Sequence, residues 1–139
     1  MAIEYPVKMC VTLEPVGNPW VDVDVEGWGR IQQLTETTDF EFEFVAQDLC
    51  CLKIKHFKKV DNDPGTAVIV KKISFFGIED SKFIWAGSYF PDYPEHYLDK
   101  TSPLPGHGYL GWNGVYRLEF SVPVFTWMHR TLDLGWIYG

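Results

Sequence analysis

The chain has 139 residues, of which 46% are hydrophobic and 22% charged, a composition typical of one folded domain with its own core. Its net charge of −7 argues against nucleic-acid binding, because neutralising phosphates requires clustered lysine and arginine. The acidity remains compatible with binding of divalent cations. No apolar run approaches the roughly 20 residues of a membrane-spanning helix, so membrane insertion is not expected.

Alternation of apolar and polar residues predicts strands along most of the chain. Phenylalanines at 40, 42 and 44 alternate with glutamates, and valines at 21, 23 and 25 alternate with acidic residues. The predicted strands cover 20–26, 39–45, 51–57, 67–78 (one long or bent strand), 82–86 and 116–122. A helical turn is allowed only within 125–134. With no linker or repeat, residues 1–139 form one domain, and about eight or nine strands indicate an all-β sandwich or barrel.

The three cysteines, Cys10, Cys50 and Cys51, do not form a disulfide framework. Adjacent cysteines on a strand point to opposite faces, so Cys50 and Cys51 cannot both reach Cys10. The N-terminus lacks the apolar core of a signal peptide. We therefore expect buried thiols in a protein made in the cytosol, a reducing compartment.

Aromatic residues, prolines and glycines are concentrated between Trp85 and Trp112. Rings in such a loop either cover the core or form a contact surface. Polar residues interleaved with the rings would suit a sugar, which has an apolar C–H face and a polar rim. The loop aromatics are Tyr89, Phe90, Tyr93, Tyr97, Tyr109 and Trp112, and the polar residues among them include Asp92, His107 and Asn113.

Asp61 and Asp63 place oxygen ligands on alternate residues just before a Pro-Gly turn, as calcium-binding loops do. Ordinary turn chemistry explains the same residues, and both interpretations remain open here. The four histidines have no zinc-binding spacing, and no nucleophile motif is present. The sequence therefore favours a protein that is not an enzyme, and the missing histidine cluster disfavours a cupin-like one.

From Phe40 to Phe120 the pattern resembles small jelly-roll modules of the calcium-dependent, xylan-binding kind. The segments that carry the resemblance are Phe-Glu-Phe, Leu-Lys-Ile-Lys-His-Phe, a polar Asp/Gly loop, Ile-Ser-Phe-Phe-Gly-Ile and Leu-Glu-Phe. Uncharacterised short proteins of marine phages are similar in Tyr-Phe-Pro-Asp-Tyr-Pro and Gly-Tyr-Leu-Gly-Trp-Asn-Gly. The resemblance implies a two-sheet β-sandwich with jelly-roll topology and sugar binding or a role in a virion. It also implies a bound calcium ion that coordinates sugar hydroxyl groups. Asp61 and Asp63 are the candidate ligands of this ion.

We predict a non-catalytic carbohydrate-binding module. Trp112, Tyr93 and Tyr97 would form the aromatic platform for the sugar, and Asp92, Asn113 and His107 would select the sugar by hydrogen bonding. The alternative is a structural or assembly subunit, of a virion for example, that uses the same aromatics for protein contact and forms a homo-oligomer.

Overall fold

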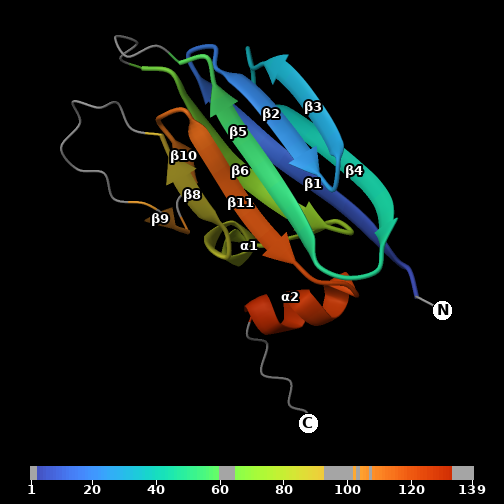
Figure 1. Cartoon of the computed structure of the whole chain (residues 1–139). Coiled ribbons are helices and arrows are strands. Elements are labelled where there is room, and N and C mark those ends of the chain that lie inside the picture. The colour runs from blue at the N-terminus through green and yellow to red at the C-terminus, as the bar shows by residue number, and fades with distance from the viewer. Residues whose placement is uncertain (1–2, 60–64, 93–101, 103, 107, 133–139) are drawn as a thin grey trace.

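The chain folds into two antiparallel sheets that pack face to face, with two helices toward the lower end (Figure 1). The computed structural model describes residues 3–59, 65–92, 102, 104–106 and 108–132. One sheet has the order β10-β6-β1-β4, with β7 also paired to β6, and the other has the order β3-β2-β5-β11-β8-β9. The strands are β1 (Tyr5–Val16), β2 (Trp20–Val25), β3 (Trp28–Gln33), β4 (Thr38–Ala46), β5 (Cys50–Phe57), β6 (Ala67–Phe75), β7 (Ile78–Glu79), β8 (Ser88–Pro91), β9 (Leu104–Pro105), β10 (Tyr109–Leu110) and β11 (Gly114–Phe120). The structure confirms the predicted all-β, two-sheet sandwich, and the chain changes sheet repeatedly, as in a jelly roll.

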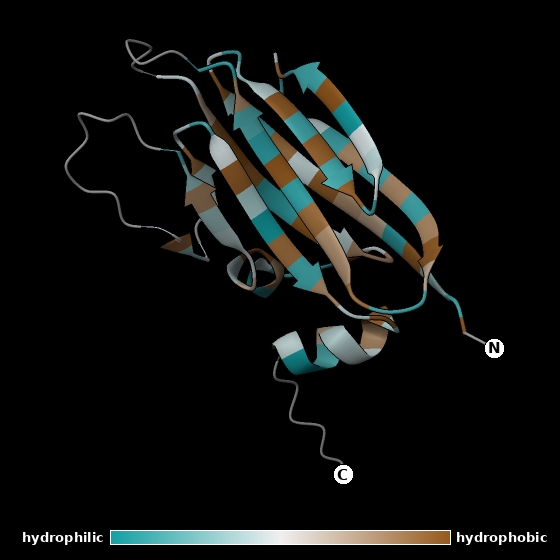
Figure 2. Cartoon of the chain, in the orientation of Figure 1, coloured by the Kyte–Doolittle hydropathy of each residue, from teal (hydrophilic) through white to brown (hydrophobic). Residues whose placement is uncertain are grey.

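Alternation in the sequence places one face of each strand in the space between the sheets. Val21, Val23 and Val25 on β2 have no exposed surface, whereas Asp22 and Asp24 lie on the outer face. Figure 2 shows the same alternation as brown and teal bands along β2, β5 and β11. The core therefore lies between the sheets, where apolar side chains from both meet.

The β2–β3 hairpin closes through a two-residue turn, Glu26 and Gly27, because Val25 pairs with Trp28. Both turn residues have positive φ values, +50° at Glu26 and +88° at Gly27. Positive φ at both central positions is the signature of a type I′ turn, whose twist matches that of the strands. Glycine adopts this region easily, but glutamate does so at a cost in free energy.

Four aromatic rings join the two sheets and both helices. Phe75 on β6 packs edge-on against Phe83, Phe120 and Trp127, with centroid distances of 5.4, 5.0 and 5.3 Å. Phe120 belongs to the other sheet, Phe83 to α1 (Ser81–Trp85) and Trp127 to α2 (Val124–Leu132). Phe75, Phe83 and Phe120 have no exposed surface. These rings close the helical end of the sandwich.

The helices differ from the sequence-based expectation. The strand predicted over 82–86 is wrong, because α1 occupies this segment. The Asp80 side chain accepts a hydrogen bond from the Lys82 N–H at 2.9 Å, which caps the helix, and α1 buries Phe83. The turn allowed within 125–134 is part of the nine-residue helix α2, which buries Val124 and Met128, one helical turn apart.

Replacing the central ring of this aromatic cluster should destabilise the whole domain. We expect Phe75→Ala to lower the free energy of unfolding by about 3–5 kcal/mol, because it removes a buried ring and leaves a cavity. Urea denaturation measures this change. The matched control is Phe125→Ala, since Phe125 is 52% exposed and stacks on Phe76 outside the cluster. A loss below about 1 kcal/mol for Phe75→Ala would show that the cluster does not hold the sheets together.

Stability should fall at high pH through the buried thiol Cys50, which is 1% exposed. Burial, followed by the nearby carboxylates of Glu26 and Asp48, raises the pKa of Cys50 to about 11 from its ordinary value of 9.0. The unfolded thiol therefore ionises at lower pH than the folded one. We expect the free energy of unfolding to decline as the pH rises from 9 to 11. In urea denaturation at several pH values, Cys50→Ala should make this decline of the unfolding free energy shallower. The same decline in the variant and the wild type would show that Cys50 does not cause it.

Candidate functional site at the Trp112 end

Strand register brings three separate segments to one end of the sandwich. Gly114, the first residue of β11, pairs with His56 near the end of β5 and with Pro91 at the end of β8. The residues just beyond these positions therefore lie side by side: Lys59 after β5, Asp92 after β8, and the Gly111–Asn113 turn before β11. We call this group of residues the Trp112 end.

Of the predicted ligand-binding residues, Trp112, Asn113 and Asp92 belong to this end. The backbone N–H of Asp92 donates to the carbonyl of Asn113 at 2.6 Å. Asp92 is exposed, and Trp112 and Asn113 are half-buried. The other predicted residues, Tyr93, Tyr97 and His107, and the metal candidates Asp61 and Asp63, lie outside the described residues.

Asn113 ties the turn before β11 to the segment after β5. Its side-chain oxygen accepts a hydrogen bond from the Lys59 backbone N–H at 2.9 Å. Its side-chain nitrogen donates to the Lys59 backbone carbonyl at 2.8 Å. The amide thus satisfies both backbone groups of Lys59 as a neighbouring strand would. The side chain of Asn113 therefore positions the site.

Lys59 is the residue of this end that sequence reasoning missed. Its ammonium group donates to the carbonyl of Thr66 at 2.8 Å and to that of Gly111 at 2.6 Å. It also lies over the Trp112 ring, 5.0 Å from the centroid, within cation–π range. No sequence signal separates Lys59 from its neighbour Lys58, which is exposed and lies 4.2 Å from the Trp20 centroid.

Trp112 is held through both its backbone and its ring. The Tyr89 hydroxyl donates to the Trp112 carbonyl and accepts from the Trp112 N–H, the latter at 3.0 Å. Tyr89 is 1% exposed, so these bonds attach the turn to the buried part of the sandwich. Tyr89 therefore fixes the backbone of Trp112, and the Lys59 ammonium group lies over its ring.

The close packing of the Trp112 end depends on Gly114. A Cβ at this position would overlap the Phe90 carbonyl oxygen and lie 2.8 Å from the Pro91 Cα. The Gly114 φ of +154° also favours glycine. A side chain here would push β8, and with it Asp92, away from Asn113.

His56 supports the same end from within the core. The residue has no exposed surface, and its Nδ1 donates to the Leu110 carbonyl at 2.9 Å, because a carbonyl can only accept. Leu110 immediately precedes the Gly111–Asn113 turn. The bond thus fixes the beginning of the turn to β5.

Metal-ligating groups do not gather in the part of the chain that the structure describes. Among those residues, no three histidine, cysteine, aspartate or glutamate side chains are close enough to hold a metal ion. The calcium prediction rested on Asp61 and Asp63, outside that part. No helix among the described residues is long and apolar enough to cross a membrane.

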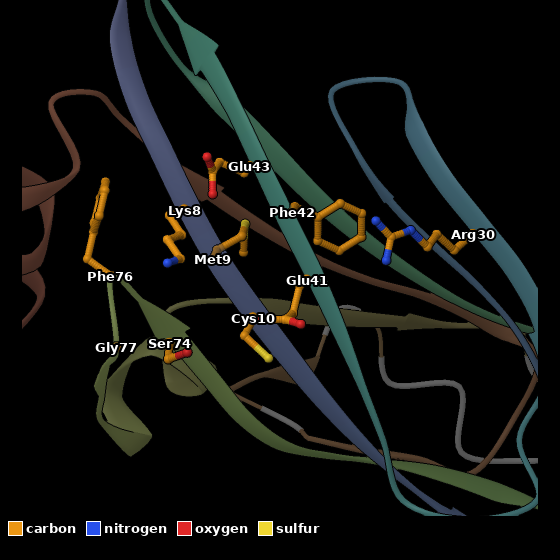
Figure 3. A pocket seen from close by; sticks show the side chains of 10 residues that line it. All are labelled: Lys8, Met9, Cys10, Arg30, Glu41, Phe42, Glu43, Ser74, Phe76 and Gly77. Carbon is orange, nitrogen blue, oxygen red and sulfur yellow. The ribbon is translucent and has the colours of Figure 1, made fainter.

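A hollow of about 660 Å³ lies along β1, β4 and the end of β6 (Figure 3). Its charged lining includes Lys8, Glu41 and Glu43, and the described site residues Asp92, Trp112 and Asn113 do not line it. Arg30 lies over the Phe42 ring at 5.0 Å from its centroid and covers the core at the sheet edge. The hollow therefore adds nothing to the Trp112 end.

Comparison with known proteins gives a likeness of fold. No family model and no curated protein matches the sequence. The structure of vCBM60 in complex with galactobiose aligns with a TM-score of 0.56 and 15% identity, over 80% of this chain and 96% of that chain. The selenomethionine form of vCBM60, described with a circular permutation linking two families of calcium-dependent carbohydrate-binding modules, has a TM-score of 0.56 and 13% identity over 81% and 89%. The resemblance to such modules is thus confirmed for the fold.

Removing the Asn113 amide should loosen the Trp112 end. We expect Asn113→Ala to lower the free energy of unfolding by about 1–3 kcal/mol, because the partly buried Lys59 backbone loses both side-chain partners. Hydrogen exchange at the Lys59 amide should become faster. Asn18→Ala is the matched control in an exposed turn. Unchanged exchange at Lys59 in Asn113→Ala would contradict the positioning role.

Proposed function

We propose that this chain is a non-catalytic carbohydrate-binding module that binds sugar at the Trp112 end. The observation that carries the proposal is that strand pairing brings Asp92 to the turn that holds Trp112 and Asn113, a separate segment of the chain. An aromatic ring beside an exposed carboxylate offers an apolar face and an acceptor for hydroxyl groups. The fold of the carbohydrate-binding module vCBM60 supports the same proposal.

Some residues of the Trp112 end would contact the sugar, and others would position the contacting groups. The Trp112 ring would stack on the C–H face of a sugar, and the exposed Asp92 carboxylate would accept from its hydroxyl groups. Asn113 and Lys59 would hold these groups in place through the bonds described above. Tyr93, Tyr97 and His107 remain predicted contributors to the same surface.

Calcium remains part of the proposal through Asp61 and Asp63. These aspartates follow Lys59 closely in sequence, and the comparison links vCBM60 to calcium-dependent modules. Carboxylate and carbonyl oxygens are the ligands that calcium prefers. An ion held by these aspartates would add a means of binding hydroxyl groups in addition to stacking on the Trp112 ring.

The first test is a glycan array that includes galactobiose, run with calcium and again with a chelator. We expect specific binding, and its loss with the chelator would support a calcium site at Asp61 and Asp63. Trp112→Ala should weaken binding at least ~10-fold, because the stacking face is lost. Trp85→Ala, which alters a 60% exposed tryptophan elsewhere, should bind as the wild type does.

The outcomes of this test separate the two functions. An array without binding at high protein concentration would reject the carbohydrate module. It would then favour the alternative, an assembly subunit, and the mass of the protein in solution would test for a homo-oligomer. A large fall in melting temperature for Trp112→Ala would show that the ring is chiefly structural.

Lys59 should matter for sugar binding and Lys58 should not. Lys59→Met keeps an unbranched apolar side chain but removes the ammonium group that holds the Thr66 and Gly111 carbonyls. We expect glycan affinity to fall by about 3–10-fold, since the Trp112 ring loses its orientation. Lys58→Met removes a cation from the Trp20 ring and is the matched control. Isothermal titration with an array-identified glycan measures both, and equal affinities would contradict the role of Lys59.

A further inference from the structure

The opposite end of the sandwich carries a second surface feature, a hollow of about 410 Å³. Its lining residues come from the β2–β3 turn, the β4–β5 turn and the start of the described chain. These segments lie at the end of the sandwich away from the start of β11 (Figure 1). Its apolar lining includes Trp28, Val45 and Leu49. We call it the Trp28 hollow.

The apolar side chains of the Trp28 hollow are exposed to an unusual degree. Trp28 is 64% exposed, Val45 58% and Leu49 55%, and Ile3, next to the lining residue Glu4, is 67% exposed. Scattered single residues of this kind are ordinary, but a group around one hollow marks an interaction surface. Glycines on both sides of Trp28 leave its ring without flanking side chains.

Val45 departs from the pattern of its own strand. On the outer face of β4, the preceding positions are acidic, Glu41 and Glu43, and Val45 occupies the next one. The core gains little from this valine, because more than half of its surface remains in water. Burial in the core therefore does not account for an apolar side chain at position 45.

Among the described residues, the charged side chains that line the Trp28 hollow are all acidic. They are Glu4, Glu26 and Asp48, with neither lysine nor arginine from the described part of the chain. The Glu26 carboxylate also accepts a hydrogen bond from the Cys51 N–H at 3.2 Å. Glu26 occupies this turn position although its φ of +50° is unfavourable for a residue other than glycine. The surface therefore combines an apolar centre with a negative rim.

We propose that the Trp28 hollow is a docking surface for a protein segment that presents a large apolar side chain flanked by lysine or arginine. Several exposed aliphatic side chains beside one ring fit a protein side chain better than a sugar. The carboxylates complement basic residues. A symmetric pair of copies would instead place Glu4, Glu26 and Asp48 against the same residues, which repel one another. This docking is independent of the sugar site.

The test uses three labelled synthetic peptides of equal length and measures binding by fluorescence anisotropy at physiological salt. One alternates lysine with leucine, the second lysine with serine, and the third glutamate with leucine. We expect only the lysine–leucine peptide to bind measurably. Trp28→Ala should weaken this binding at least ~10-fold, and so should the double variant Glu26→Gln with Asp48→Asn. Glutamine at position 26 retains an acceptor for the Cys51 N–H.

Matched variants distinguish this docking from attraction to an acidic protein in general. Trp85→Ala removes a similarly exposed tryptophan, and Glu14→Gln with Glu36→Gln removes the same number of charges from residues that do not line the hollow. Both should bind the peptide as the wild type does. Equal weakening in the controls, or no binding by the wild type, would overturn the proposal.

Two further outcomes would assign the hollow to another occupant and so also overturn the proposal. One is loss of glycan binding in Trp28→Ala, which would make the hollow a sugar site. The other is a dimeric wild type that becomes monomeric in Trp28→Ala, which would make the occupant a second copy. Failure of the sugar proposal alone would be visible as a blank array with peptide binding intact.

Discussion

The contact of Phe75 with Phe83, Phe120 and Trp127 is the packing interaction on which the rest of the structure depends. Each of these four rings comes from a different element, and together they join both sheets to both helices. No disulfide bond joins the two sheets, because the three cysteines are free. The relative position of the sheets therefore rests on burial of side chains between them.

A fixed position of the sheets is what makes the Trp112 end possible. β11 lies between β5 and β8, so its first residue, Gly114, sets where the flanking segments end relative to the turn before it. Short polar contacts then complete the arrangement: Asn113 holds the backbone of Lys59, and Lys59 holds the carbonyl of Gly111. These bonds are local, but they form only because the strand register has already brought the partners together.

The two ends of the sandwich differ in chemistry. The Trp112 end combines a ring with a lysine ammonium group and an exposed carboxylate, and its ring is half-buried. The Trp28 hollow combines an exposed ring with aliphatic side chains and carboxylates alone. If both proposals hold, one domain would present a sugar-binding surface at one end and a surface for a basic protein segment at the other.

The sequence by itself determined the fold class, because alternation is a local property that assigns each strand an inner and an outer face. The alternation of Phe40, Phe42 and Phe44 with glutamates predicts one inner face for these rings, of which Phe40 and Phe42 are buried and Phe44 is partly buried against the core. The sequence did not predict β1 (Tyr5–Val16), because the prolines near both ends of this strand are not typical of strands. It also predicted a strand in place of α1, because five residues are too few to show a helical period. Only the tertiary structure decided which residues meet at each end. Nothing local distinguishes Lys59 from Lys58, since their surroundings are created by pairing of strands far apart in the chain.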